Sequence, residues 1–96
     1  MIDTMRAGRL SVYNIDLPKR VVRQLDKVLS KDYPSVSKAI QNLRETPRPT
    51  GCKKLLESFY RIRIGDYRVI YWIDDANKNI VITKVERRKE RTYRHF

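Results

Sequence analysis

Hydrophobic residues near the start of the chain first alternate with polar ones and then recur at helical spacing. Residues 11–16 (SVYNID) alternate in this way, which is typical of a strand. Pro18 suits the first turn of a helix, because its missing N–H group would have no intrahelical partner there. Apolar residues then recur with basic residues on the other side, at Val21, Val22, Leu25, Val28 and Leu29. The pattern predicts a strand followed by an amphipathic helix.

A second helix is expected after a break in this pattern. The pair Tyr33-Pro34 interrupts the first helix, because proline disfavours helical backbone in the residue before it. After Ser35, apolar residues return at helical spacing, at Val36, Ala39, Ile40 and Leu43. Residues 46–51 (TPRPTG) contain too many helix breakers for a regular element. We expect the two helices to pack beside each other as a hairpin.

Three strand-like segments make up most of the second half of the chain. Residues 58–64 and 67–73 are rich in β-branched and aromatic side chains, and only Gly65 and Asp66 separate them. Two linking residues, with glycine first, are the signature of a tight β-hairpin. A third segment of the same kind spans residues 80–85.

The order of these elements predicts an α+β fold. It consists of one strand, a two-helix hairpin and three antiparallel strands, with the helices packed on one face of the sheet. A short basic tail, residues 87–96, follows. A chain of 96 residues has room for one core, so we expect residues 1–96 to form a single domain.

Each expected strand presents two different faces, because side chains alternate along it. Tyr60, Ile62 and Ile64 share an apolar face that suits packing against the helices. If Gly65 and Asp66 form the whole turn, the facing pairs are Ile64–Tyr67, Arg63–Arg68, Arg61–Ile70 and Phe59–Trp72. The other face of the hairpin then combines arginines with aromatic rings.

The facing arginines on this hairpin suggest a site for an anion. Like charges directly opposite each other cost about 0.2 to 1 kcal/mol, and an anion bound between Arg63 and Arg68 would offset that cost. Guanidinium groups match phosphate oxygens in paired hydrogen bonds, and Phe59 or Trp72 offers a surface on which a base can stack. A structural explanation is also open, because basic residues on a strand discourage edge-to-edge aggregation.

The overall charge of the chain indicates which kinds of partner it binds. The chain has 22 Lys and Arg against 11 Asp and Glu, a net charge of +11, which favours a nucleic acid or an acidic protein. No apolar run approaches the roughly 20 residues that cross a bilayer, and the amino terminus lacks the apolar core of an export signal. A lone cysteine, Cys52, can form neither an internal disulfide nor a cysteine-based metal cluster. We expect a cytoplasmic protein with no membrane partner, no metal and no cofactor.

Two segments resemble a known family. Residues 60–71 (YRIRIGDYRVIY) resemble the central hairpin of the RelE/ParE toxin superfamily. Residues 85–94 (VERRKERTYR) resemble its carboxy-terminal signature, in which a basic pair is followed by an acid and a tyrosine. The similarity covers roughly residues 11 to 94. The hairpin motif is more specific for the superfamily than for one activity, because members that poison gyrase share the fold.

The resemblance implies a RelE-type toxin of a type II toxin–antitoxin system. Such a toxin is a ribosome-dependent, metal-independent mRNA endoribonuclease that inhibits translation. Its partners are the ribosome, mRNA and a cognate acidic antitoxin that holds it silent. Carried over position by position, the resemblance implies the catalytic residues Arg61, Arg63, Arg68, Arg88 and Tyr93. Nearby basic and aromatic residues are candidates for RNA binding, namely Lys53, Lys54, Phe59, Trp72, Arg87, Lys89 and Arg91.

The reaction that we expect is attack of an RNA 2′-hydroxyl on the adjacent phosphate. It needs charge stabilisation, a base for the hydroxyl and an acid for the leaving oxygen. The arginines suit the first task, but an arginine essentially never deprotonates. Tyr93 is the candidate for moving a proton, and stacking on a base or anchoring the tail are its alternative roles.

Two other functions fit the same residues. A ParE-like inhibitor of DNA gyrase would use the tail as a contact surface, and Arg68 would then be structural. A non-catalytic basic RNA-binding module would need only the charge. The combination of Arg68, Arg88 and Tyr93 favours the ribonuclease.

Overall fold

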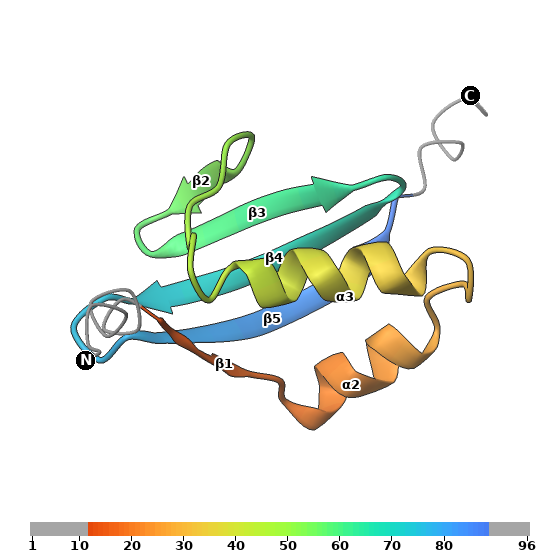
Figure 1. The fold of residues 1–96 in the computed structure, drawn as a ribbon, viewed down its shortest axis with the longest axis horizontal. Helices are drawn as coiled ribbons and strands as arrows, with labels where there is room; N and C mark the ends of the chain where they lie inside the picture. The colour runs from red at the N-terminus through yellow and green to blue at the C-terminus, as the bar shows by residue number, and fades with distance from the viewer. Residues whose placement is uncertain (1–11, 89–96) are drawn as a thin grey trace, which may run out of the picture.

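The computed structural model describes residues 12–88, which form two helices and a five-stranded mixed sheet (Figure 1). In chain order the elements are β1 (Asn14–Asp16), α2 (Lys19–Asp26), α3 (Tyr33–Asn42), β2 (Lys53–Leu56), β3 (Phe59–Ile64), β4 (Tyr67–Asp74) and β5 (Asn79–Arg87). The strand order is β1-β5-β4-β3-β2, with β1 parallel to β5 and the other neighbouring pairs antiparallel. None of the helices in this range is long and apolar enough to span a membrane.

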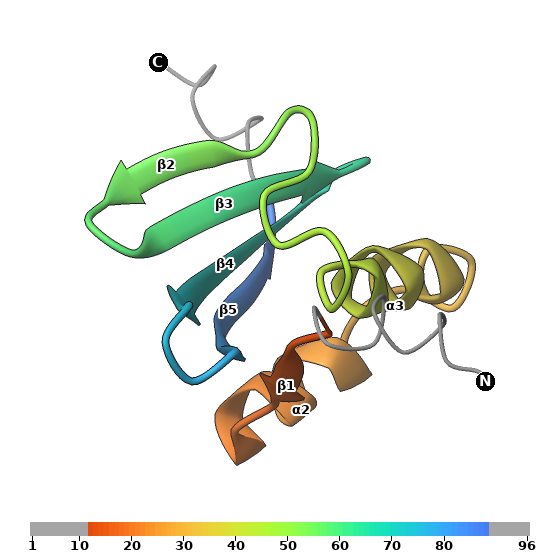
Figure 2. The same cartoon turned by 60° about the vertical axis from the view of Figure 1, so that its left-hand side comes forward.

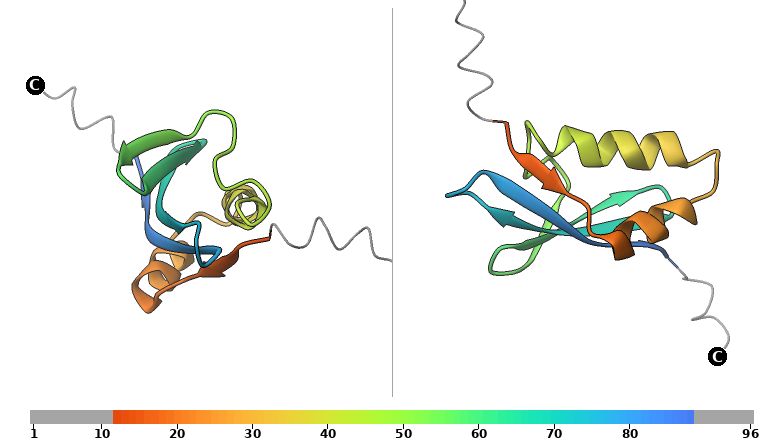
Figure 3. Two further views of the ribbon diagram at one scale, coloured as in Figure 1. Left: turned by 90° about the vertical axis from the view of Figure 1, so that its left-hand side faces the viewer. Right: turned by 90° about the horizontal axis from the view of Figure 1, so that it is seen from below.

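The helices cover one face of the sheet, as the sequence pattern predicts. The end view shows the sheet curving around α3, with α2 near the edge formed by β1 and β5 (Figures 2 and 3). Contacts join α2 to β5 and α3 to β3. The fully buried side chains of the core come from the helices and from alternate strand positions, and include Val21, Val36, Leu43, Val69, Tyr71, Ile80 and Ile82. The core therefore lies between the helices and one face of the sheet.

Two features of the sheet differ from the sequence prediction. Lys53–Leu56 forms the edge strand β2, although all four residues are exposed and show no alternation. The first strand pairs in parallel with β5, so the sheet is mixed and not purely antiparallel. No local sequence pattern predicts either pairing, because each depends on how the chain as a whole packs.

Several element boundaries also differ, and β1 is shorter than the predicted strand over residues 11–16. Helix α3 begins at Tyr33, because Pro34 sits in the first turn, where its missing N–H group costs no hydrogen bond. Helix α2 ends at Asp26, and Val22 and Leu29, expected on its apolar face, are 42% and 41% exposed. Strand β5 runs to Arg87, two residues beyond the predicted end. The rest of the predicted basic tail, from residue 89 onward, lies outside the described residues.

The central hairpin matches its predicted register. Gly65 has a φ of 59°, which a glycine adopts without steric cost in such a tight turn. The pairs Ile64–Tyr67, Arg63–Arg68, Arg61–Ile70 and Phe59–Trp72 all face each other across β3 and β4. The two faces of the hairpin therefore have the predicted compositions.

An irregularity in β5 changes which of its residues face the helices. Ile70 pairs with Lys84 and Tyr71 pairs with Ile82, so Thr83 is an extra residue without a counterpart in β4. The Thr83 hydroxyl donates a hydrogen bond to the Ile70 carbonyl oxygen (3.0 Å). One extra residue inverts the alternation beyond it. As a result Val85 is buried, and Lys84 lies on the opposite face of the sheet.

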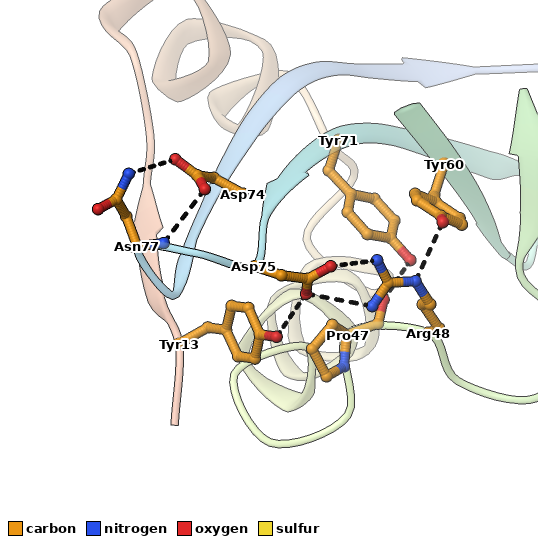
Figure 4. A network of polar contacts seen from close by, with 8 residues as sticks. All are labelled: Tyr13, Pro47, Arg48, Tyr60, Tyr71, Asp74, Asp75 and Asn77. Carbon is orange, nitrogen blue, oxygen red and sulfur yellow. Dashed lines mark hydrogen bonds and ion pairs between the residues drawn. The ribbon is translucent and has the colours of Figure 1, made fainter. Parts of the chain in front are cut away.

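An ion pair joins the loop after α3 to the turn between β4 and β5 (Figure 4). The Arg48 Nη2 donates to Asp75 Oδ2 (2.9 Å), and Arg48 Nε donates to the Tyr60 hydroxyl (3.0 Å). The hydroxyl of Tyr13, which lies just before β1, donates to Asp75 Oδ1 (2.6 Å). These contacts connect β1, β3 and two loops at one end of the sheet.

The same loop is held from the core side by Tyr71. Its ring is fully buried, and its hydroxyl donates to the Pro47 carbonyl oxygen (2.8 Å). The loop leads directly into β2, so these anchors determine where β2 meets β3.

The Asp75 contacts predict a pH-dependent contribution to stability. The hydrogen bond from Arg48, followed by that from Tyr13, lowers the pKa of Asp75. A carboxyl with a lowered folded-state pKa stabilises the fold above its ordinary pKa of about 3.9, and this contribution is lost as the pH falls through the folded-state value. We expect Asp75→Asn to lower Tm at pH 7 and to reduce the fall in Tm that the wild-type chain shows below about pH 4.

Thermal melts followed by circular dichroism between pH 2 and pH 7 measure this effect. The matched control is Asp26→Asn, which makes the same change at an exposed position on α2. Identical pH profiles for Asp75→Asn and the wild type would contradict the proposed contribution of the Arg48–Asp75 pair.

Candidate nucleic-acid interface

The sheet face away from the helices, called the open face here, carries three rows of side chains. Their order follows from the strand register, because directly paired residues point to the same side. The first row is Glu86, Arg68 and Arg63. The second is Lys84, Ile70, Arg61 and Lys53. The third is Val81, Trp72, Phe59 and Leu56. Two charged rows thus lie beside one apolar and aromatic row.

The first row has a feature that the sequence analysis does not predict. Arg63 faces Arg68 as expected, but the carboxylate of Glu86 lies on the other side of Arg68, with Oε2 2.8 Å from Arg68 Nη2. The other oxygen, Oε1, is 3.5 Å from Lys84 Nζ. An acid of the chain itself, and not only a bound anion, therefore compensates part of the charge at Arg68. One sequence feature could have predicted the place of Glu86. Val85 follows Ile82 by three residues and not by two, so the three apolar residues share one face only if the strand contains a bulge.

Two arginines of the open face have unused hydrogen-bond donors. The Nε atoms of Arg61 and Arg68 are buried and have no hydrogen-bond partner within residues 12–88. Leaving a buried donor unpaired costs about 1 to 3 kcal/mol. An acceptor-rich ligand such as a phosphodiester could satisfy these donors after a small movement of the side chains.

A pocket of about 480 Å³ adjoins the second row at the outer edge of β3. Strand β2 pairs with β3 only as far as Lys53 and Arg61. The remainder of β3, from Ile62 onward, has no β2 residue beside it, and the pocket lies there, next to the loop that precedes β2. The lining residues are Thr50, Gly51, Cys52, Lys53, Arg61, Ile62 and Arg63. Three of these side chains are cationic, which suits a negatively charged ligand.

The third row provides an apolar surface beside the charged ones. Trp72 and Phe59 face each other across β3 and β4, as predicted. Trp72 is partly buried, Phe59 is 36% exposed, and Leu56 on β2 is 66% exposed. Many proteins bind single-stranded nucleic acids with accessible aromatic rings next to arginines. The bases stack on the rings, and the phosphates contact the cations.

Two of the predicted RNA-binding residues do not share the open face. Lys53 pairs with Arg61 and faces the open side, whereas Lys54 pairs with Tyr60 and points to the helix side. Arg87 pairs with Tyr67, and its guanidinium lies 5.9 Å from the centre of the Tyr67 ring. Strand alternation therefore places Lys54 and Arg87 on the other side of the sheet from Lys53 and Arg61, and their role in RNA binding stays a prediction.

The predicted tail residues are described only at their start. The backbone N–H of Arg88 donates to the Asp66 carbonyl oxygen (2.6 Å), which places Arg88 beside the turn that follows Arg63. Lys89, Arg91 and Tyr93 lie outside the described residues. Within residues 12–88, no group of three or more His, Cys, Asp or Glu residues could hold a metal ion.

Comparison with known proteins identifies the family. A family model for the ParE toxin of type II toxin–antitoxin systems (parDE) matches residues 15–92. The chain belongs to the RelE/ParE toxin superfamily. A RelE1 toxin relative from Methanocaldococcus jannaschii is 30% identical over 82 residues, which cover 80% of this chain and 91% of the relative. The resemblance inferred from the hairpin and tail motifs is thus confirmed.

Solved structures of this superfamily share the fold. A chain of the RelBE2 toxin–antitoxin complex from Mycobacterium tuberculosis superposes with a TM-score of 0.71 at 25% identity, covering 82% of this chain and 94% of that one. A chain of the RelE–RelB complex from Pyrococcus horikoshii gives a TM-score of 0.70 at 28% identity, with 80% and 96% covered. This chain is accordingly a RelE-type toxin of a type II toxin–antitoxin system.

Proposed function

We propose that this RelE-type toxin is an endoribonuclease that cleaves mRNA on the ribosome without a metal ion. The observation that carries the proposal is the convergence of Arg61, Arg63 and Arg68 on the open face, next to the aromatic pair Phe59 and Trp72. A single-stranded RNA laid across the rows would have phosphates near the arginines and bases near the rings. Inhibition of translation would follow from loss of the message.

The proposed reaction is an internal transfer within the RNA. The 2′-oxygen forms a bond to the adjacent phosphorus, the bond from phosphorus to the 5′-oxygen breaks, and the products carry a 2′,3′-cyclic phosphate and a 5′-hydroxyl. Negative charge develops on the phosphoryl oxygens, and fixed donors aimed at it stabilise the transition state. Arg61, Arg63, Arg68 and Arg88 are the residues that we assign to this role.

Proton transfer is assigned to Tyr93. The reaction removes a proton from the 2′-hydroxyl and delivers one to the leaving oxygen, and arginines do neither. A cationic environment lowers the free-energy cost of a phenolate, so the basic tail around Tyr93 suits the task. A site with so few proton carriers needs its substrate placed for it, which is consistent with dependence on the ribosome.

We also propose that an acidic antitoxin silences the toxin. RelB is bound to RelE in the complex from Pyrococcus horikoshii, and the complex from Mycobacterium tuberculosis is likewise one of toxin and antitoxin. In this chain the net charge of +11 favours a partner of opposite sign. An antitoxin segment that covers the open face would occupy the same arginines as the message. Both partners imply that the protein acts in the cytoplasm.

Inhibition of DNA gyrase is the second candidate function, because the matching family model is that of ParE. Toeprinting on translating ribosomes, run beside a gyrase supercoiling assay, separates the two functions. We expect new mRNA 5′ ends on the translating ribosomes and unchanged supercoiling. Blocked supercoiling with an intact message would favour the gyrase inhibitor.

Arg68→Ala is expected to abolish cleavage while leaving the fold intact. The ion pair of Arg68 with Glu86 is partly exposed, so its loss should affect Tm little, but loss of one transition-state contact typically lowers a rate by about 100-fold or more. The measurement is single-turnover cleavage on programmed ribosomes. The control is Arg23→Ala on α2, away from the open face, and a wild-type rate for Arg68→Ala would remove Arg68 from the site.

Tyr93→Phe separates the roles proposed for that residue. If the hydroxyl carries a proton, the cleavage rate should fall by roughly 100-fold or more with little change in RNA affinity. If the ring stacks on a base, Phe should retain activity and Tyr93→Ala should lose it. Near-wild-type rates for both variants would rule out a catalytic role for Tyr93.

A further inference from the structure

Glu86 is an acidic side chain in direct contact with Arg68, one of the proposed phosphate contacts. It faces Arg68 across β4 and β5, and a 2.8 Å ion pair joins the two side chains. The side chain of Glu86 is 29% exposed, so it sits partly within the surface that the RNA would cover. A carboxylate at this point repels an incoming phosphodiester, and the proposed reaction has no use for it.

We propose that Glu86 is an internal competitor that holds Arg68 in the resting toxin and is displaced from it by an RNA phosphate. The inference rests on the proposed function, since it takes RNA as the ligand of the open face. A carboxylate and a phosphodiester each carry one negative charge and bind the same guanidinium edge. The two anions therefore compete for Arg68.

Lys84 is positioned to receive the displaced carboxylate. Its Nζ is 3.5 Å from Glu86 Oε1, whereas Arg68 contacts the other carboxylate oxygen, Oε2. Lys84 is half exposed, and its flexible side chain can follow the carboxylate. Glu86 can thus shift from Arg68 to Lys84 without losing a cationic partner, which keeps the cost of displacement small.

The bulge at Thr83 makes this arrangement possible. Without the extra residue, the alternation of Ile80 and Ile82 would place Lys84 on the helix side of the sheet. With it, Lys84 and Glu86 both reach the open face beside Arg68. The consequence is a binding face with limited affinity for RNA, which favours release of the cleaved product.

Binding of RNA at several salt concentrations tests the proposal. The probe is a fluorescent single-stranded RNA with 2′-deoxyribose at every position that could be cleaved, measured by anisotropy. Glu86→Gln keeps the shape of the side chain but removes its charge. We expect about 2- to 5-fold tighter binding, the range set by a surface charge pair. We also expect the slope of log K against log salt to steepen by about 0.7, equivalent to one further neutralised phosphate.

Two matched variants complete the test. Glu86→Asp retains the charge and should keep the wild-type salt slope. Glu45→Gln makes the same charge change at an exposed position after α3 and should also leave the slope unchanged. A wild-type slope for Glu86→Gln would overturn the proposal, and an accompanying fall in Tm would show that Glu86 only locks β4 to β5.

A different binding result is expected if the open face is not the RNA site. In that case the RNA would bind the wild type and Arg68→Ala with equal affinity, whatever the residue at position 86. If Arg68→Ala weakens binding and Glu86→Gln behaves like Glu45→Gln, the RNA site stands and the competitor does not.

Discussion

The register of the β3–β4 hairpin is the constraint on which the rest of this structure depends. Gly65 allows a turn of two residues, so Arg63 must face Arg68 and every second residue must face the helices. A slip of one residue would move the arginines into the core and Tyr60 into solvent. The apolar contacts of one face therefore determine the chemistry of the other, and the stability of the core keeps like charges together on the open face.

The bulge at Thr83 applies the same physics to β5. One unpaired residue lets Ile80, Ile82 and Val85 all be buried, although they do not share one alternation. It also delivers Glu86 to Arg68, so that the open face is neither uniformly basic nor neutral. This partial neutralisation lowers the repulsion between the facing arginines in a chain whose net charge is +11.

Local patterns were enough to predict the central features of the fold. The α+β class, the two helices, the β3–β4 register and the separation of arginines from Tyr60 and Ile62 all follow from periodicity and one glycine turn. The edge strand β2 and the parallel pairing of β1 could not be predicted, because each depends on contacts between distant segments. Glu86 was missed because its place depends on a bulge, and the sides of the sheet on which Lys54 and Arg87 lie could not be predicted because charge alone does not indicate a face.

The central claim is that RNA binds the open face with its bases on the aromatic row. Trp72 is the only tryptophan of the chain and lies in that row, so its fluorescence reports on this surface without any substitution. Titration with the deoxy-substituted single-stranded RNA should quench the Trp72 emission in a saturable way, whereas inorganic polyphosphate, which has no bases to stack, should leave it nearly unchanged. Unaltered Trp72 emission under conditions where anisotropy shows the RNA to be bound would contradict the account.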